Sequence, residues 1–509
     1  MSTPSTPSTP STSATPSTSA TPSTPPLPSA PATSDLATGF SRPSPAARRR
    51  SFLALAAIIG TQLMLLLDAT VVNVALPDLG RDLHFTPTGM SWVLNVYTLA
   101  FGGLLLLGSR IGDLIGRRTA LVWGVTAFTL ASVAGGVATS ATVLLIARAL
   151  QGAAAALAAP STLALITTSF TEGGERNRAL SVFSAVAGAG FAIGLTVGGM
   201  LTGWGSWRWV FFINIPIGLA VVLIAPRFIK ETQRHRGGRF DIAGAVTGTL
   251  GMATLSYAFI RVAETGWGDG RGLICFGAAL ALLAAFLVNE VRAERPLVVL
   301  GLFADRNRAL AYCVMLLVPA SMFGVFYFTT QYLQNQLGYS PLRTGFAFLP
   351  LAGLLFAAAR VAPRALGRFG PRRMAATGIG LTLAGGLWIA QLSASEGYAA
   401  GLLGPLMLFG FGMGCTMMPL NTVILSGVQP KDAGSASGLL QTMQQVGASL
   451  GLSILVTVFG TAARHAHHNA FLHGATTAFL AGTVFSAIAL VLALSIRPKP
   501  PTLERVGGS

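Results

Sequence analysis

Asp68 is the acidic residue that stands deepest in an apolar stretch of this sequence, and Arg148 is a basic residue in a similar setting. A charged side chain is costly where water is absent, so such residues are candidates for function. A nearby guanidinium tunes the affinity of a carboxylate for its proton. The pair is therefore our candidate for proton uptake and release. The alternative is a static ion pair that only fixes packing, but buried ion pairs are poor stabilisers and need another reason to exist.

The stretches that hold these residues are membrane-spanning in character. The chain of 509 residues is 52% hydrophobic and 10% charged, with a mean hydropathy of +0.63. Soluble domains carry about a quarter charged residues, which argues against a soluble enzyme. We count fourteen apolar segments of the length that crosses a bilayer. They lie near residues 52–76, 89–109, 119–139, 142–168, 179–201, 207–228, 240–262, 272–291, 309–331, 345–361, 375–393, 400–424, 435–459 and 474–496.

The two charged residues lie at similar depth in their segments. Asp68 is roughly 12 Å of helix rise from the end of the first segment, and Arg148 is roughly 9 Å from the start of the fourth. These two segment ends fall on the same face of the membrane. The spacing therefore predicts that the side chains face each other. The acids Asp241 and Glu290 lie near segment ends instead, where water is close.

Basic residues predict the orientation of the spans. An even number of spans places both termini on one side, and 27 of the 34 basic residues then fall on that side, with six on the other and Arg148 inside a span. Basic residues favour the cytoplasmic side, so both termini are expected in the cytoplasm. The net charge of +17 is concentrated in short gaps between spans, which is typical of topology signals and does not indicate a nucleic-acid partner.

Two charge-rich stretches divide the spans into six, two and six. The sequence predicts a disordered Ser/Thr/Pro-rich cytoplasmic tail at 1–50, with an inert extension favoured over a docking or phosphorylated tail. The predicted parts that follow are a six-helix bundle at 51–228, a linker with two extra helices at 229–308, a second six-helix bundle at 309–497 and a cytoplasmic tail at 498–509. Two six-helix halves are typical of a class of secondary transporters.

Polar residues within the spans are candidates for a substrate cavity. Gln441, Gln444 and Gln445 have helical i, i+3, i+4 spacing and are expected on one face. Single amides in other spans either line a cavity or form hydrogen bonds between helices. These single amides are Asn73, Asn95, Asn214, Gln331 and Asn421. The His-rich stretch 464–473 is expected to be a solvated loop, and we expect no metal and no cofactor.

Several stretches, in their order and spacing, resemble the major facilitator superfamily, and specifically its fourteen-span drug:proton antiporters. The stretches LLDATVVNVALP (66–77), GSRIGDLIGRRTAL (108–121), LIARALQGAAAA (145–156) and GAGFAIGLTVGG (188–199) carry this resemblance. Later stretches that fit are WRWVFFINIPIG (207–218), QYLQNQLGYSPLRTGFAFLP (331–350) and KDAGSASGLLQTMQQVGASLG (431–451). The resemblance covers roughly residues 52–497. It implies twelve core helices in two bundles with two helices inserted between them.

The resemblance also implies roles for particular residues. Asp113, Gly116, Arg117 and Arg118 match a signature that holds the two halves in one conformation, with Ser109 at a position where the family has Gly. Arg148 matches an arginine associated with proton coupling, and Asp68 matches the family's acidic position. The antiporter motif is matched by four glycines, while Leu195 stands where the family has Pro. These glycines are Gly190, Gly194, Gly198 and Gly199.

The sequence therefore predicts a proton-driven exporter of lipophilic, in some cases cationic, compounds that works by alternating access. Asp68 is expected to bind protons and substrate in competition. The alternative is export of a lipid or of a self-made metabolite, as in antibiotic self-resistance. The charged turn and the buried charge argue against a scaffold or sensor. A channel is disfavoured because no filter repeat is visible, and an enzyme because no nucleophile–base set is visible. The expected setting is the plasma (inner) membrane, with protons, a small lipophilic molecule and membrane lipid as partners and a monomeric chain.

Overall fold

The computed structural model describes residues 45–86, 88–170, 174–232, 241–293, 296–298, 300–393, 396–428, 433–466 and 469–497. The predicted N-terminal tail therefore lies outside the described residues up to position 44, and the predicted C-terminal tail lies wholly outside them. The chain divides into Met1–Ala47 and Arg48–Ser509. The arrangement below concerns the second of these units.

All regular structure in the described residues is helical, and no strand occurs there. The first group of helices is α1 (Pro45–Asp82), η1 (Gly89–Ser91), α2 (Trp92–Ile115), α3 (Arg117–Gly136), α4 (Ala141–Ser169), α5 (Gly174–Trp204), α6 (Trp209–Phe212) and α7 (Asn214–Phe228). A pair follows, α8 (Ile242–Thr265) and α9 (Gly270–Arg292). The last group is η2 (Leu300–Phe303), α10 (Arg306–Gln331), η3 (Tyr332–Gln336), α11 (Pro341–Ala347), α12 (Leu349–Ile389), η4 (Ala399–Leu403), α13 (Gly404–Leu425), α14 (Ala433–Arg464) and α15 (Ala470–Leu494).

The predicted spans correspond to these helices, with two differences in the count. Among the described residues, 12 helices are long and apolar enough to cross a membrane. The predicted spans 345–361 and 375–393 lie in the single element α12, which breaks at Gly370, where φ is 76°. The predicted span 179–201 lies in α5, a continuous helix outside that set of 12. Leu195 of α5 is helical, so the chain has no proline break at that position.

Local sequence explains where several helices begin and end. Asp241 and Asp305 cap α8 and α10, because their side chains accept hydrogen bonds from the backbone amides of Gly244 and Arg308 at 2.7 Å and 2.9 Å. Gly116 ends α2 with φ of 100°, a conformation that side chains with a Cβ rarely adopt. The chain reverses there, and α3 starts at the next residue.

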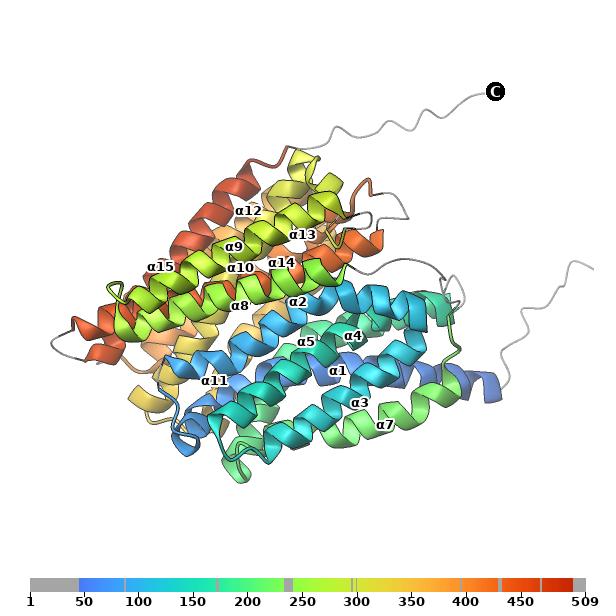
Figure 1. Ribbon diagram of the computed structural model, residues 1–509, viewed down its shortest axis with the longest axis horizontal. Helices are drawn as coiled ribbons and strands as arrows, with labels where there is room; N and C mark the ends of the chain where they lie inside the picture. Colours follow the sequence, from blue (N-terminus) through green and yellow to red (C-terminus); the bar gives the residue numbers. More distant parts are fainter. Residues whose placement is uncertain are drawn as a thin grey trace, which may run out of the picture. The chain divides into compact units, whose positions relative to one another are not determined.

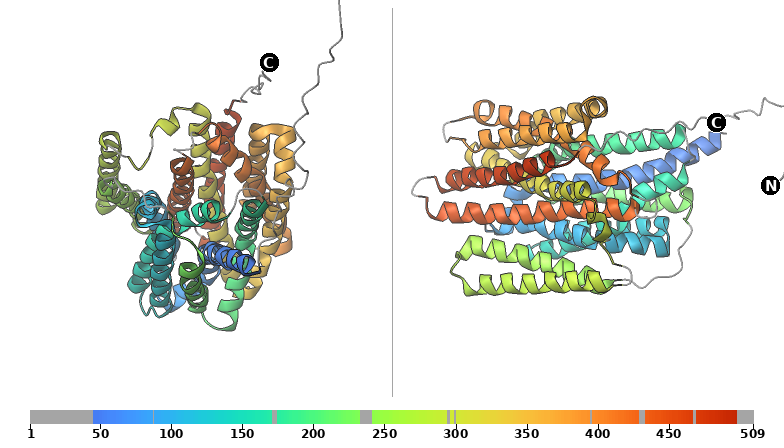
Figure 2. Two further views of the ribbon diagram at one scale, coloured as in Figure 1. Left: turned by 90° about the vertical axis from the view of Figure 1, so that its right-hand side faces the viewer. Right: turned by 90° about the horizontal axis from the view of Figure 1, so that it is seen from above.

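The helices form two contacting groups, with α8 and α9 at their junction. In the first group, α2 packs on α4, and α3 packs on α4 and α7. In the second, α10 packs on α14 and α15, and α12 packs on α13. The groups meet where α2 contacts α14 and where α5 contacts α11 and α12. The antiparallel pair α8–α9 lies along α2 and α14 through α8 (Figures 1 and 2).

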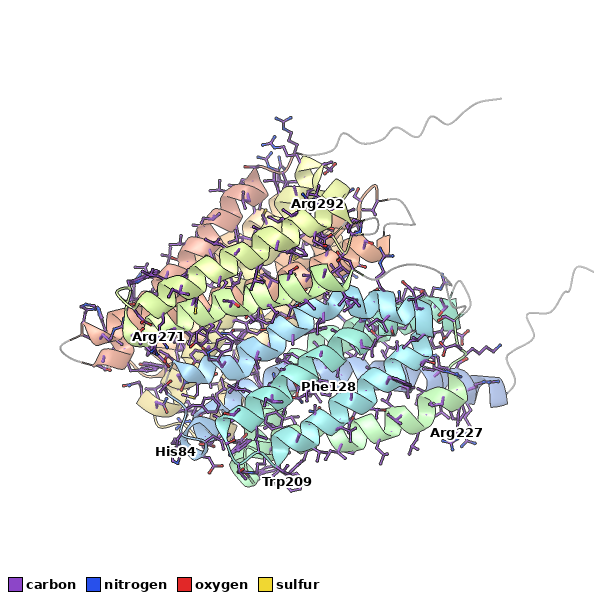
Figure 3. The ribbon with its side chains drawn as sticks, viewed as in Figure 1. His84, Phe128, Trp209, Arg227, Arg271 and Arg292 are labelled. Carbon is purple, nitrogen blue, oxygen red and sulfur yellow. The ribbon has the colours of Figure 1, made fainter. Side chains whose placement is uncertain are left out.

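The helical assembly has two ends, which are named here by the turns between α1 and α2 and between α2 and α3. The α1–α2 end holds the turn at 83–86, and Figure 3 shows His84, Trp209 and Arg271 near it. The α2–α3 end holds Gly116, and Figure 3 places Arg227 toward it. Arg271 and Arg292 mark the opposite ends of α9.

Large apolar side chains cover the outside of the helices. Trp123, Leu130 and Ile274 are 67%, 66% and 71% exposed. The apolar part of α9 is only 11% buried inside the protein. A soluble protein rarely exposes apolar surface on this scale, whereas helices in a bilayer present such side chains to lipid. The structure thus supports a polytopic membrane protein.

Candidate functional site

The structure brings Asp68 of α1 against Arg148 of α4. Their carboxylate Oδ2 and guanidinium Nη1 are 2.5 Å apart. Both side chains have no exposed surface. The facing arrangement expected from their depths in the sequence is therefore present. The contact links the first and fourth helices inside the first group.

Three polar side chains complete the surroundings of the carboxylate. Gln151 Nε2 donates to Asp68 Oδ1 at 2.9 Å, and Asn214 Nδ2 donates to the same oxygen at 3.1 Å. Ser132 Oγ accepts from the Gln151 amide at 2.8 Å and from the Asn214 amide at 3.3 Å. All of these side chains are fully buried. Both carboxylate oxygens thus accept hydrogen bonds, which fixes the orientation of the side chain.

Arg148 connects this acid to α2. Its Nε donates to the carbonyl of Val93 at 3.0 Å, and its guanidinium lies 4.3 Å from the centre of the Tyr97 ring. Its Nη1 also donates to Gln151 Oε1 at 3.0 Å. Its Nη2 is buried and has no hydrogen-bond partner among the described residues. A guanidinium that holds an acid and a neighbouring helix at once can transmit a change at the acid to that helix.

The site is enclosed by the first group of helices. The hydrogen-bond partners of Asp68 among the described residues come from α4 and α7. The carboxylate has no exposed surface, so a substrate does not reach it in this conformation. Direct competition between proton and substrate at Asp68 requires a conformation in which the carboxylate is accessible, and it stays a prediction.

Asn95 lies at the contact between the two groups, not in the Asp68 cluster. Its Nδ2 donates to Ser453 Oγ of α14 at 3.0 Å, and its Oδ1 accepts from Ser449 Oγ at 3.3 Å. Further along the same contact, Thr442 Oγ1 donates to the carbonyl of Gly102 at 3.3 Å. These bonds join α2 to α14 directly. Asn95 therefore acts as an interhelical hydrogen-bonding residue.

The glycines of α5 face two different partners. A Cβ on Gly198 would lie 2.8 Å from the carbonyl oxygen of Val71 in α1. A Cβ on Gly199 would lie 2.6 Å from the carbonyl oxygen of Pro341 in α11. Small residues let helix backbones approach closely. Gly198 thus lets α5 pack closely on α1 of its own group, and Gly199 lets α5 pack closely on α11 of the other group.

The approach of α5 and α11 is reciprocal. A Cβ on Gly345 of α11 would lie 2.6 Å from the carbonyl oxygen of Leu195 in α5. Each helix thus uses a glycine where the other presents a backbone carbonyl. Nearby, Gln334 Nε2 donates to the carbonyl of Val74 in α1 at 2.8 Å. We call these contacts the α5–α11 seam. They lie toward the α1–α2 end.

The other predicted cavity residues are dispersed. Gln331 Nε2 approaches the Met90 sulfur at 3.7 Å, across the two groups. Gln444 Nε2 lies 3.5 Å from the Met315 sulfur within the second group, whereas Gln445 packs against Gly102 of α2. Gln444 and Gln445 thus have different neighbours.

Three of the predicted amides, including Asn214 of the Asp68 cluster, have a buried oxygen that is not paired within the described residues. Asn73 Oδ1 and Asn421 Oδ1 have no hydrogen-bond partner among the described residues. Gln441 is partly buried. Asn73, Asn421 and Gln441 keep the candidate role in a substrate cavity that the sequence predicts.

Asp113 and Arg117 form an ion pair within the α2–α3 turn, with 2.5 Å between Oδ1 and Nη2. Both residues belong to the first group of helices. The role of this pair as a latch between the two halves stays a prediction.

Glu231, which follows α7, contacts this turn, although the predicted motif does not include it. Its carboxylate accepts from the backbone amides of Arg118 and Thr119 at 3.0 Å and 3.2 Å and from the Thr119 hydroxyl at 2.6 Å. It also pairs with the Arg118 side chain at 3.4 Å. The free amides at a helix start attract an anion. A Cβ on Gly116 would overlap the same carboxylate, so glycine is required there for two reasons.

The helical fold, its apolar outer surface and its buried charged cluster are those of a polytopic membrane transporter. Residues 58–452 match the Major Facilitator Superfamily. The chain belongs to this family, as its motifs predict.

Curated relatives extend over most of the chain. It is 42% identical to the puromycin resistance protein pur8 of Streptomyces alboniger, over 82% of this chain and 84% of the relative. It is 38% identical to the cephamycin export protein CmcT of Amycolatopsis lactamdurans, over 86% of this chain and 92% of the relative. It is 34% identical to the tetracenomycin C resistance and export protein of Streptomyces glaucescens, over 83% and 79%.

Solved structures agree on the fold. A mutant form of the nucleoside transporter NupG has a TM-score of 0.62 at 12% identity and covers 87% of this chain and 98% of its own. A bacterial homologue of the human lysosomal transporter Spinster, in an inward-facing and occupied conformation, has a TM-score of 0.63 at 16% identity and covers 88% and 96%.

Proposed function

We propose that this protein is a proton-driven efflux antiporter that exports lipophilic small molecules across the plasma membrane. The observation that carries the proposal is the buried Asp68–Arg148 pair and its amide partners. Buried ion pairs contribute little net stability. Titratable groups inside a membrane are typical of proton relays. Asp68 is thus the proton-binding residue, and Arg148 sets its affinity.

The two halves provide alternating access. In this proposal the bundles are residues 51–228 and 309–497, with α8 and α9 as inserted helices. The α2–α3 end faces the cytoplasm, together with both termini, because the arginine-rich turns lie there. The α5–α11 seam then closes the outer end. Transport requires this seam to open and the α2–α3 end to close.

Protonation acts through α2. A proton on Asp68 removes the negative partner of Arg148 and weakens a charge-assisted hydrogen bond. Arg148 also holds the carbonyl of Val93, two residues before Asn95, which bonds α14 of the other half. Protonation of Asp68 thus reaches the contact between the halves through less than one turn of α2. Substrate and proton compete through the conformation and not through a shared binding point.

The substrate class follows from the relatives. Their names record resistance to puromycin and export of cephamycin and tetracenomycin C. These relatives favour the second candidate function, export of a self-made antibiotic as self-resistance, over export of a lipid. For drug efflux and for self-resistance alike, the substrate is a small amphiphilic molecule. The protein works as a monomer in the membrane, without a cofactor.

Transport in inside-out vesicles with an imposed pH gradient tests this function. The panel contains fluorescent dyes, puromycin, a β-lactam, a polyketide and a labelled phospholipid. We expect uptake of at least one amphiphilic drug, driven by an acidic vesicle lumen and abolished by a protonophore. Uptake that persists without a pH gradient, or uptake of the phospholipid alone, contradicts the proposal.

A further inference from the structure

A second site is present at the α2–α3 end of the other half, far along the chain from Asp68. A cavity of about 780 Å³ opens between the start of α10, the break in α12 and the ends of α13 and α15. Its size falls in the range of small-ligand sites. We propose that this cavity binds the phosphate of an anionic phospholipid headgroup. The proposal stands independently of the transported substrate.

The cavity has an excess of positive charge. Arg372, Arg373 and Arg497 line it, against a single acid, Asp305. None of the three arginines forms an ion pair within the part of the chain that the structure describes. The Asp305 carboxylate is engaged as the helix cap of α10, where it accepts from the Arg308 amide at 2.9 Å. Arginine side chains recognise phosphate by charge and by paired N–H donors.

Helix geometry adds to this charge. Gly370 breaks α12 with φ of 76°, so the second arm of the helix has its own N-terminus at Pro371, Arg372 and Arg373. The N-terminus of a helix attracts anions. Arg308 is buried and donates from Nε to the carbonyl of Ile424 at 3.0 Å. It thereby pairs with a carbonyl at the C-terminal end of α13, which is the negative end of that helix. Arg308 thus offsets part of the negative end of α13, whose last residues line the cavity.

The walls are held in place and are partly apolar. Asn307 and Arg497 exchange two hydrogen bonds of 2.9 Å, which fix the end of α15, at the top of Figure 1, beside the start of α10. Phe369 and Leu494 also line the cavity and are 53% and 47% exposed. A basic pocket between helix ends with an apolar margin fits the phosphate and upper acyl chains of a lipid better than a free inorganic ion.

Native mass spectrometry of the delipidated full-length protein tests this site. The probes are dioctanoyl phosphatidylglycerol, dioctanoyl phosphatidylcholine and inorganic phosphate. We expect phosphatidylglycerol adducts on the wild type that exceed phosphatidylcholine adducts at equal concentration. The triple variant Arg372→Gln/Arg373→Gln/Arg497→Gln should lower the affinity for phosphatidylglycerol about a hundredfold, because each basic residue near an anionic lipid contributes about a fivefold factor.

A matched variant controls for the loss of three charges. Arg227, Arg360 and Arg364 are exposed and lie outside the cavity lining, so replacing all three by Gln should leave phosphatidylglycerol binding unchanged. If the triple variant does not fold, the single variants Arg373→Gln and Arg497→Gln replace it. Each is expected to lower the affinity for phosphatidylglycerol about fivefold. Equal phosphatidylglycerol binding by the triple cavity variant and the triple control variant overturns the proposal. Displacement of the lipid by inorganic phosphate at similar concentration also overturns it and assigns the site to a free anion.

Discussion

Asn95 of α2 donates a 3.0 Å hydrogen bond to Ser453 of α14, and this bond spans the two halves of the transporter. Asn95 is two residues along α2 from Val93, whose carbonyl accepts from Arg148. The Asp68 cluster and the contact between the halves are thus one short helical segment apart. This proximity gives the proposed coupling a physical path that needs no contact between substrate and Asp68.

Asn95→Ala tests that path. The variant loses both bonds to α14, each worth about 1 kcal/mol, while the Asp68 cluster stays intact. We expect weaker coupling, seen as less proton release per substrate exported in proteoliposomes. Thr98→Val is the control, because the Thr98 hydroxyl bonds only to the backbone of α2, at Leu94 and Asn95. Equal losses of coupling in both variants would show that the bond across the halves has no special role.

The sequence predicts the charged part of the site better than its polar surroundings. Asp68 and Arg148 stand out because charges inside spans are rare and their depths match. Asn214 appears as a polar residue in a span, but nothing in its type tells it apart from Asn95, which faces the other half. Ser132 gives no signal at all, because single serines are common in membrane helices.

The fold follows from patterns of another kind. Apolar segment length predicts the helices, since each must match the bilayer. Two predicted spans lie on either side of Gly370 in α12, where φ of 76° interrupts the helix in a conformation that glycine adopts readily. The role of Glu231 at the start of α3 depends on a contact between distant residues, which spacing along the chain does not reveal.

The α5–α11 seam leads to a prediction about conformation. Gly199→Ala places a methyl group about 2.6 Å from the Pro341 carbonyl, so the seam cannot close without a shift. We expect a population more open at the α1–α2 end. Gly203→Ala is the matched control on the same helix, because its methyl group would meet Leu342 at an ordinary 3.4 Å.

Spin labels at Val182 of α5 and Val361 of α12 measure this change, in a background without Cys275, Cys313 and Cys415. These positions lie on the α2–α3 side of the seam, so opening at the α1–α2 end should shorten the distance between the labels. Unchanged distance distributions in Gly199→Ala would mean that the seam tolerates the methyl group and does not control access.

Substitution of Arg148 separates its charge from its hydrogen bonds. Arg148→Ala leaves the buried Asp68 carboxylate without its cation. We expect export to fail or its pH profile to change. Arg148→Lys keeps the charge but not the planar set of donors to Val93 and Gln151. Its pH profile should stay near that of the wild type while its maximum rate falls. Identical profiles for all three proteins would contradict the role of the cation.

The ion pair in the α2–α3 turn provides a test of the predicted latch. An exposed pair is worth only about 0.2–1 kcal/mol, so Asp113→Asn should leave folding and substrate affinity nearly unchanged. A bias of about 1.4 kcal/mol changes a two-state ratio tenfold, so a partly shielded latch suffices to shift the conformation. We expect the Val182–Val361 label distance to lengthen in Asp113→Asn, as the α2–α3 end opens. Unchanged distances would mean that Asp113 has no role as a latch and that only Arg117 and Arg118 matter, as topology signals.

The most direct test of the account measures substrate-induced proton release in proteoliposomes that contain Asp68→Asn. Asparagine keeps the size of the side chain but cannot carry a proton. Asp78→Asn, at the exposed end of the same helix, is the control and should behave as the wild type. The account predicts that Asp68→Asn inserts in the membrane and binds substrate but releases no protons. Proton release at the wild-type level from Asp68→Asn would contradict the central claim that this carboxylate couples export to protons.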